Sequence, residues 1–475
     1  MTILKLTSGS HSDQYNPSVI KVLESANENE LNKPSPEHKS SKVDQLAESK
    51  VNEPKIDKLL EQKVDNIDAT SCITTKPNDT KDYLLILSLK QNYKIILNLS
   101  GGAFGQVYIA QIISKDSQPR SKELQVETKG TLLERTKGYE NRNYQALARK
   151  VCAIKIMRPK REFNTIEKTL KSSEVQFVLN VPYHDNLLQS YGMFFNSEAS
   201  TPQFCLTMEP METDFYETIN VRAREKKPFK LSTVKNILKQ IIDGLAHMHK
   251  HGWYHRDVKT ENILCTRTGS FYSEEFIKEH NPYLKYQEYV VKIADYGSTT
   301  KILKPMEKPS KSFGTVAFLP PEIALEVEDV SYEKMDIWGV GCIALDLMLM
   351  HFYVFHAETA KSHLKSLLSV MDDPLTEMSK VSKEKLTPEV KEQFLDLNKA
   401  LLDIGMDPIF LKNCQSGGVK SLQKRLDNFA SEWKELASVV KLCMSWNHYL
   451  RPTAQGLADM EVFKDSVAEV NHDIE

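Results

Sequence analysis

The sequence predicts an α+β fold in which a strand-rich part precedes a helix-rich part, with a long polar segment before both. Residues 1–82 contain neither Trp nor Phe and are rich in Ser, Asn, Glu, Lys, Asp and Pro. From Tyr83 to Met157, apolar runs of strand length are separated by glycine-rich or polar stretches. From Val234 onward, apolar residues recur at helical spacing. Strands and helices that occupy separate regions are the pattern of an α+β chain.

The overall composition excludes several classes of protein. The 475 residues carry 62 Lys and Arg against 64 Asp and Glu, so the net charge is −2. A nucleic-acid binder usually has a strongly basic field, and we expect no such partner. The most apolar stretch, Ile337–Met350, contains Asp346 and is shorter than the ~20 residues that span a bilayer, so we expect no membrane span. The first residues lack the basic start and apolar run of a secretory signal.

The cysteines indicate a reducing compartment. They are odd in number, widely spaced and without a C-x-x-C pair, which argues against a disulfide framework and against a zinc site. We therefore expect reduced thiols in the cytoplasm or the nucleus, with the cytoplasm preferred. The cysteines are Cys72, Cys152, Cys205, Cys265, Cys342, Cys414 and Cys443.

The polar segment 1–82 is predicted to be a disordered N-terminal tail. It cannot bury enough apolar surface to offset the entropy of ordering its backbone. Within it, a Lys–Val/Ile–Asp/Asn triplet recurs at residues 42, 50, 55 and 63. Two interpretations stay open: a segment that docks on a partner, and drifted low-complexity sequence.

The first ordered elements are predicted to be strands. Tyr93–Leu99 and Gln106–Ala110 have strand composition and flank the glycine cluster Ser100–Gly105. The apolar run Val151–Met157 predicts a third strand. We interpret the polar run 112–149 between them as a surface insertion, because long loops are tolerated at surfaces.

A long amphipathic helix is predicted from seven apolar residues at spacings of three and four. Ser232 is its expected N-cap and Gly252 its expected terminator. Helical periodicity resumes at Tyr332 and continues toward the C-terminus. The seven apolar residues are Val234, Ile237, Leu238, Ile241, Ile242, Leu245 and Met248.

Two features of the strand region have both a functional and a structural interpretation. The glycines of Ser100–Gly105 let backbone N–H groups approach a phosphate, although a plain glycine-rich hairpin has the same composition. A dinucleotide fold is disfavoured, because it would place such a loop between a strand and a helix. Lys155 lies on an apolar strand and either pairs with an anion or extends to solvent, since a buried unpaired ammonium is costly.

The helix-rich part carries the most specific pattern. His255–Asn262 reads H-R-D-x-K-x-x-N. At about one in twenty per position, five fixed residue types occur by chance in such a chain on the order of 10⁻⁴ of the time. Asp295–Gly297 (D-Y-G) follows the strand-like run Tyr289–Ile293, where a carboxylate either holds a hard cation such as Mg²⁺ or belongs to an ordinary turn. Gly314–Glu322 and Asp336–Gly341 come next.

The order of these motifs resembles the signature set of the protein kinases, from glycine loop and strand lysine to D-x-G and G-T…P-E. The chain resembles a eukaryotic-type protein kinase over about residues 83–465. Lys259 and Thr315 match the serine/threonine branch, with no subfamily assigned. The resemblance implies a two-lobed fold: a small β-rich N-lobe (83–210, carrying the insertion 112–149), a large helical C-lobe (211–466) and a C-terminal tail (467–475).

The resemblance implies transfer of the γ-phosphate of ATP to serine or threonine hydroxyls of proteins. Asp257 would orient the acceptor hydroxyl and Lys259 would neutralise charge on the γ-phosphate. Lys155 would hold the α- and β-phosphates, paired with Glu174, for which Glu167 is the weaker alternative.

The cofactors implied are ATP and Mg²⁺. Asn262 and Asp295 would hold the metal ion. The hinge Glu209–Met211 would offer backbone groups to the adenine, with Met208 as gatekeeper. The nucleotide-binding residues would be Leu99, Gly101, Gly102, Ala103, Phe104, Gly105, Val107, Ala153, Lys155, Glu209, Met211 and Leu264.

The resemblance also implies structural pairs and a regulatory site. Glu322 and Arg451 would form a buried ion pair, and Tyr296 would stack with His255 in an apolar column between the lobes. Arg256 marks kinases whose activation segment is ordered by a phosphate, for which Ser310 is the first choice and Ser312 the second. Three motifs depart from the family pattern: Ser100 replaces a glycine, P-P-E replaces A-P-E and D-Y-G replaces D-F-G.

An active kinase, monomeric and acting on protein substrates, is the leading hypothesis. A pseudokinase scaffold that binds nucleotide and partners without phosphorylating them is the alternative, but its expected loss of Lys155, Asp257, Asn262 or Asp295 is not seen. In a third hypothesis, the protein has the same fold but transfers phosphate to a small molecule or lipid. The segment Val316–Leu319 resembles one that receives a peptide and argues against it.

Overall fold

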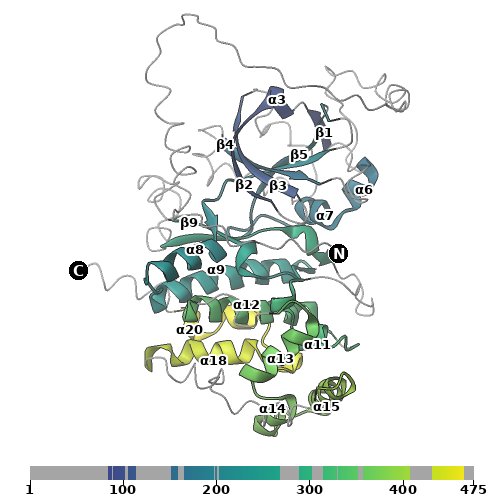
Figure 1. Cartoon of the computed structure of the whole chain (residues 1–475), viewed down its shortest axis with the longest axis vertical. Helices are drawn as coiled ribbons and strands as arrows, with labels where there is room; N and C mark the ends of the chain where they lie inside the picture. Colours follow the sequence, from purple (N-terminus) through teal and green to yellow (C-terminus); the bar gives the residue numbers. More distant parts are fainter. Residues whose placement is uncertain are drawn as a thin grey trace, which may run out of the picture.

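The computed structural model has two lobes, one built around a β-sheet and one mainly of helices (Figure 1). The α+β class expected from the sequence, and the two-lobed form implied by the resemblance, are confirmed. The predicted tail, 1–82, and the insertion after residue 113 lie outside the described residues. The structure describes residues 84–87, 89–101, 105–113, 151–158, 165–196, 198–199, 203–267, 288–301, 314–328, 330–350, 357–406 and 431–464.

The sheet of the smaller lobe has six strands in the order β1-β5-β6-β4-β3-β2. β4 has the bounds expected from its apolar run, whereas β3 continues through Ile112, so the insertion begins later than predicted. β1, which was not predicted from the sequence, pairs in parallel with β5 at one edge. The strands are β1 (Leu84–Leu87), β2 (Tyr93–Gly101), β3 (Gly105–Ile112), β4 (Val151–Met157), β5 (Ser190–Asn196) and β6 (Phe204–Met208).

β4 places the candidate lysine because its side chains alternate between two cores. Cys152 and Ile154 belong to a small core on one face of the sheet. Ala153 belongs to the main core on the other face, and the alternation puts Lys155 on that same face. The main core on this face also includes Val175 and Phe177 of the helix α7 (Ser173–Asn180), and Figure 1 shows α7 next to the sheet on the side of the larger lobe.

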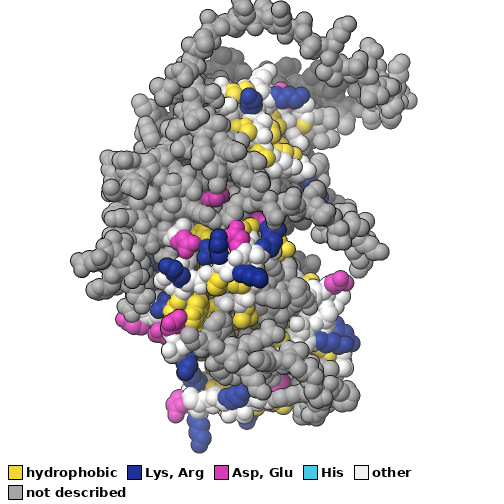
Figure 2. Space-filling model, turned by 60° about the vertical axis from the view of Figure 1, so that its left-hand side comes forward, with side chains coloured by type: hydrophobic (Ala, Val, Ile, Leu, Met, Phe, Trp, Pro, Cys, Tyr) yellow, Lys and Arg dark blue, Asp and Glu magenta, His cyan; other side chains and the backbone are white. Residues whose placement is uncertain are grey.

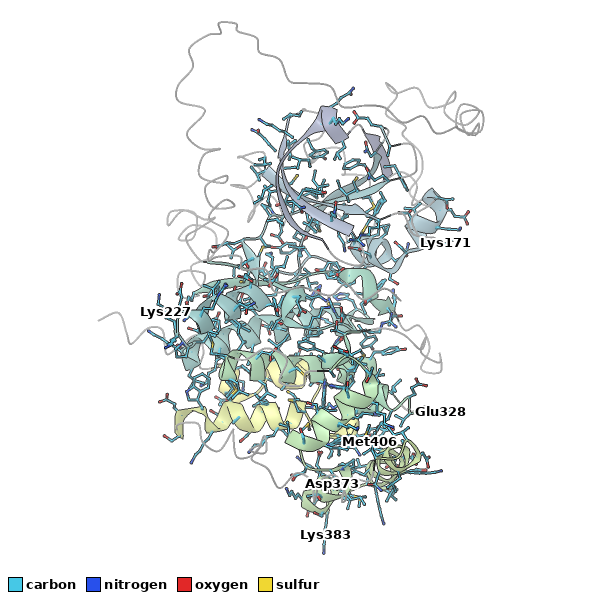
Figure 3. All side chains as sticks on the ribbon, viewed as in Figure 1. Lys171, Lys227, Glu328, Asp373, Lys383 and Met406 are labelled. Atoms are coloured by element: carbon cyan, nitrogen blue, oxygen red, sulfur yellow. The ribbon has the colours of Figure 1, made fainter. Side chains whose placement is uncertain are left out.

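Two short helices follow β4, α6 (Ile166–Lys171) and α7 (Ser173–Asn180). The Thr165 hydroxyl oxygen caps α6 by accepting a hydrogen bond from the N–H of Lys168. Lys171, at the end of α6, extends into solvent (Figure 3). α7 instead buries Glu174 together with its apolar residues, so its one carboxylate faces inward.

The larger lobe begins with α8 (Phe215–Arg224) and the long helix α9 (Leu231–Lys250). The predicted N-cap Ser232 is wrong: Lys230 occupies that position without a side-chain cap, and Ser232 lies in the first turn. The helix starts earlier because Leu231 already packs against the main core. Gly252 follows the helix end with φ of +74°, as its role as terminator requires.

α12 (Tyr332–Leu349) runs through the centre of the larger lobe and is buried along almost its whole length. Gly339 lets it approach the segment that follows the H-R-D motif. A Cβ added at Gly339 would lie 2.6 Å from Cβ of Val258, a distance that real side chains do not adopt. Val258 is adjacent to Asp257, so α12 forms the floor beneath the candidate catalytic loop.

The rest of the larger lobe is helical, apart from short sheets. The predicted pair of Glu322 and Arg451 is present and bidentate, with both N···O distances 2.7 Å and both side chains buried. The remaining elements are β7 (Thr213–Asp214), β8 (Trp253–Tyr254), β9 (Ile263–Arg267), β10 (Tyr289–Ile293), β11 (Thr300–Lys301), α11 (Pro321–Ala324), α13 (Ala360–Val370), α14 (Pro374–Lys380), α15 (Pro388–Asp403), α18 (Lys434–Cys443), α19 (Ala454–Ala458) and α20 (Glu461–Lys464).

The surface of the described residues carries charges of both signs. Figure 2 shows Lys and Arg interspersed with Asp and Glu on one face, without a large area of a single sign. None of the described helices has the length and apolar character needed to cross a bilayer.

Candidate active site

A buried lysine lies between two carboxylates where the two lobes meet. Nζ of Lys155 is 2.8 Å from Oε1 of Glu174 and 2.9 Å from Oδ1 of Asp295. The structure thus brings together residues from β4, α7 and the segment after β10, and the partner of Lys155 is Glu174. Glu167, the weaker candidate, pairs with Lys171 on the surface instead.

The two carboxylates determine the charge of this lysine. Burial alone would lower the pKa of Lys155, but Glu174 and Asp295 outweigh burial and raise it, so the ammonium form is stable. Burial likewise acts to raise the pKa of Asp295, and Lys155 reverses this and holds it below its ordinary value. The ammonium of Lys155 and the carboxylate of Asp295 therefore stabilise each other's charged forms.

The glycine-rich loop is described only at its ends. Leu99, Gly101, Gly105 and Val107 lie on β2 and β3, whereas 102–104, with predicted Gly102, Ala103 and Phe104, lie outside the described residues. A Cβ at Gly105 would lie 2.4 Å from the carbonyl oxygen of Ile156 on β4. Glycine is therefore required here for β3 to pair closely with β4.

Three polar side chains, those of Thr315, Asn262 and Lys259, contact the carboxylate of Asp257. The Thr315 hydroxyl donates to Oδ1 (3.0 Å), and the amide nitrogen of Asn262 donates to Oδ2 (3.1 Å) and to the backbone carbonyl of Asp257 (2.8 Å). Nζ of Lys259 lies 3.2 Å from Oδ2 and 2.6 Å from Oγ1 of Thr315. The carboxylate is held from several sides, so its orientation is fixed before a substrate arrives.

The catalytic loop is anchored from below by Asp336 on α12. Its carboxylate accepts hydrogen bonds from the N–H groups of His255 (2.8 Å) and Arg256 (2.7 Å) and from Nε2 of His249 (2.9 Å). These bonds stabilise Arg256 in the left-handed region, with φ of +65°. The strained backbone turns the next residue, Asp257, toward Thr315.

The guanidinium of Arg256 is engaged by described residues. Its Nε donates to the carbonyl of Ser298 (2.7 Å), and its Cζ lies 5.3 Å from the ring centroid of Tyr332. Ser310 and Ser312, the predicted phosphorylation sites, lie outside the described residues.

The predicted apolar column is present at Tyr296. Its ring stacks on Phe177 of α7 with centroids 4.0 Å apart and meets the ring of His255 edge-on at 6.3 Å. The preceding residue, Asp295, has φ of +60°. The sequence did not single out Phe177, because an apolar residue on a short helix has no distinguishing local signal.

The predicted hinge, Glu209–Met211, directly follows β6, and the side chain of Glu209 is bound to other parts of the protein. Its Oε1 accepts a hydrogen bond from the N–H of Gln189 (2.7 Å) and is 2.9 Å from Nζ of Lys292. Any contact of Glu209 with a nucleotide would therefore use its backbone. Lys292 was not predicted to be paired, although a lysine on the buried strand β10 is the same signal that identified Lys155.

The apolar residues predicted to receive the adenine come from both lobes. Ala153 of β4 pairs in register with Met208, and Met211 is buried just beyond it. Leu264 on β9 and Val107 on β3 are only partly buried against the main core. Partly exposed apolar side chains from two lobes are what a nucleotide base requires on its two faces.

A neighbouring segment is held by a buried histidine that the sequence analysis did not consider. Nε2 of His363 on α13 hydrogen-bonds to the carbonyl of Leu319, 2.7 Å away. Burial lowers the pKa of His363 to about 4, so the imidazole is neutral and Nε2–H is the donor. This bond ties the segment Val316–Leu319 to the helix beneath it.

Asn262 and Asp295 fit a magnesium ion by their chemistry. Asn262 uses its amide nitrogen on Asp257, which leaves its oxygen as a ligand, and Asp295 supplies a carboxylate with an accessible side chain. Hard oxygen ligands of this kind suit Mg²⁺, which is usually held by one or two carboxylates plus phosphates. Among the described residues no group of three or more His, Cys, Asp or Glu could hold a metal by itself, so phosphate oxygens would complete the coordination.

Comparison with known families gives a match over most of the part of the chain that the structure describes. Residues 137–463, more than half of the chain, match the family described as "Protein kinase domain".

Similar proteins include the meiosis induction protein kinase IME2/SME1 of Saccharomyces cerevisiae, 30% identical over 383 residues that cover 80% of this chain and 56% of the relative. Cyclin-dependent kinase 11 of Dictyostelium discoideum is 25% identical over 256 residues, 54% of either chain. Serine/threonine-protein kinase ICK of Mus musculus is 30% identical over 194 residues, 41% of this chain and 26% of the relative. The chain spans about half the length, or less, of these relatives.

Proposed function

Since this chain belongs to the eukaryotic-type protein kinases, we propose that it transfers the γ-phosphate of ATP to serine and threonine hydroxyls of protein substrates. The observation that carries the proposal is the carboxylate of Asp257, held by the Thr315 hydroxyl and the Asn262 amide beside the Lys155–Asp295 pair. Phosphoryl transfer requires a group that orients the substrate hydroxyl and a nearby cation that stabilises charge on the phosphate.

Asp257 would accept a hydrogen bond from the substrate hydroxyl and direct its oxygen in line with the phosphorus. A carboxylate is a weak base near pH 7, so its contribution is chiefly orientation, with the proton accepted late. The bonds from Thr315 and Asn262 support this role, because they remove the rotational freedom of the carboxylate.

Lys259 would neutralise charge on the γ-phosphate. Its ammonium lies within 3.2 Å of Asp257 and 2.6 Å of Thr315, so it is directed into the same space as the acceptor carboxylate. A compact ammonium suits a point contact with a phosphate oxygen.

Lys155 would hold the α- and β-phosphates, with Glu174 keeping the ammonium in place. The phosphates would take over the contact that Asp295 now makes with Lys155, which releases the Asp295 carboxylate for a metal ion. Mg²⁺, when bound, neutralises charge on the phosphates. Asn262 and Asp295 would be its protein ligands.

Serine and threonine are the proposed acceptors for two reasons. Lys259 and Thr315, the residues that match the serine/threonine branch, contact each other and Asp257. IME2/SME1 and the other similar proteins are named as kinases, one of them as a serine/threonine kinase.

The test is transfer of labelled γ-phosphate from Mg·ATP to a generic basic protein and to the chain itself, with phosphosites mapped by mass spectrometry. Label on serine or threonine is expected. Label on tyrosine alone would overturn the proposed acceptor. Binding of ATP without any label would favour the pseudokinase scaffold, and autophosphorylation at Ser310 would support control by the activation segment.

A further inference from the structure

We propose that the hydroxyl group of Tyr296 is a positioning group, which fastens the D-Y-G segment so that Asp295 is directed into the site. The family pattern has phenylalanine at this position, so the hydroxyl is an additional donor in this chain. The hydroxyl is proposed to fix the position of Asp295. The role of Asp295 as a metal ligand rests on the proposed function.

The hydroxyl makes hydrogen bonds inside the apolar column. Tyr296 Oη lies 2.8 Å from the carbonyl oxygen of Ile293 and 3.3 Å from that of Leu188. Tyr296 is 4% exposed, so water cannot replace these partners. A hydroxyl buried at this depth is costly unless it is hydrogen-bonded. Its single proton is shared between the two carbonyls, with the shorter contact to Ile293 and the longer one to Leu188.

The hydroxyl joins two segments of the chain, because its two acceptors lie far apart in the sequence. Ile293 is the last residue of β10, two residues before Asp295, and its carbonyl also accepts from the N–H of Leu188 (2.9 Å). Leu188 lies between α7 and β5 in the smaller lobe. Tyr296 thus connects the segment that carries Asp295 to the lobe that carries Lys155 and Glu174.

The segment needs such a connection because its backbone is under strain. Asp295 has φ of +60°, a conformation that costs a non-glycine residue free energy, and Gly297 two residues later permits other conformations. Stacking of the Tyr296 ring on Phe177 opposes release of the segment, and a phenylalanine would retain it. The hydroxyl adds a directional bond that a phenylalanine would lack.

The test compares Tyr296→Phe with Tyr289→Phe and the wild type. Tyr289 is a buried tyrosine at the start of β10 whose hydroxyl bonds Arg222, so its loss is a matched control away from the site. The first readout is amide hydrogen exchange in the nucleotide-free protein. The reporters are the N–H groups of Ala294 and Thr299, which donate to the carbonyls of Asn262 and Tyr296.

The second readout is the affinity for ADP with and without Mg²⁺, measured by calorimetry. In Tyr296→Phe, exchange at Ala294 and Thr299 should be about 2- to 10-fold faster, the range expected for one net hydrogen bond. Affinity for ADP with Mg²⁺ should fall by a similar factor while affinity without Mg²⁺ is retained.

Two results would overturn the proposal: unchanged exchange with unchanged Mg²⁺ dependence, or the same changes in Tyr289→Phe. Neither readout requires phosphate transfer. Failure of the proposed function would instead appear as absent transfer by the wild type.

Discussion

Nζ of Lys292 lies 2.9 Å from Oε1 of Glu209, and both side chains are buried. The ammonium also donates to the carbonyl of Asp185 (2.8 Å), and the carboxylate accepts from the N–H of Gln189 (2.7 Å). A pair of opposite charges therefore joins the hinge, the segment after α7 and β10, the strand that leads to Asp295.

Replacing Lys292 by methionine is expected to lower the free energy of unfolding by about 3–5 kcal/mol. The loss comes mainly from the Glu209 carboxylate, which would remain buried without its cation. The measurement is denaturant unfolding of the full chain. The double variant Lys292→Met/Glu209→Gln, which removes both charges, should recover at least half of the loss, and a single variant as stable as wild type would contradict this account.

Thr315→Val should lower kcat by about 10- to 100-fold, because Asp257 and Lys259 both lose the hydroxyl that fixes their positions. Steady-state kinetics with a protein substrate measures the effect. Thr315→Ser keeps the hydroxyl and is the matched control, which should retain most of the activity. Equal rates for the valine and serine variants would show that the hydroxyl positions nothing.

Because of His363, the free energy of unfolding should decrease as the pH is lowered below the ordinary pKa of histidine. Its folded pKa is about 4 against an ordinary 6.5, so between these values the unfolded chain binds a proton that the folded chain does not. Its contribution is present above pH 6.5 and is lost progressively toward pH 4, by up to about 3 kcal/mol. Unfolding measured from pH 4 to 7 should show a shallower slope for His363→Gln, and an unchanged slope would refute this assignment.

Deletion of residues 1–80 is expected to leave basal activity within a few fold of the full chain. The described structure begins at Leu84, and β1 pairs with β5 through Leu84–Leu87. Deletion of residues 1–88 removes that strand and exposes an edge of the sheet, so it should lower the thermal unfolding temperature where the shorter deletion does not. A large loss of activity on deleting 1–80 would show that the tail is required.

The elements that the sequence predicts best are buried strands with a continuous apolar run. Val151–Met157 and Tyr289–Ile293 have the predicted bounds, because strands covered on both faces need apolar residues throughout. The predicted start of α9 was wrong. Ser232 is a residue type that commonly caps helices, but the helix begins at Leu231, which packs against the core. Tertiary packing, which the local sequence does not show, decided that boundary.

In the candidate site, too, contacts between motif residues could be predicted and contacts decided by tertiary packing could not. The pairing of Lys155 with Glu174 could be predicted because family motifs fix the spacing of both. The pairing of Lys292 with Glu209 and the bond from His363 to Leu319 could not, because each joins residues far apart in the chain with no motif between them. Such contacts are decided by tertiary packing, which the local sequence does not show.

The most direct test of the account is the initial rate of γ-phosphate transfer by the wild type, Asp257→Asn and Lys155→Met, measured beside nucleotide binding and thermal unfolding. We predict transfer by the wild type alone. Asp257→Asn should remain folded and bind ATP, because the asparagine keeps the shape of the side chain but lacks the acceptor carboxylate. Transfer by Asp257→Asn at a rate near that of the wild type would contradict the central claim that this carboxylate orients the hydroxyl that receives the phosphate.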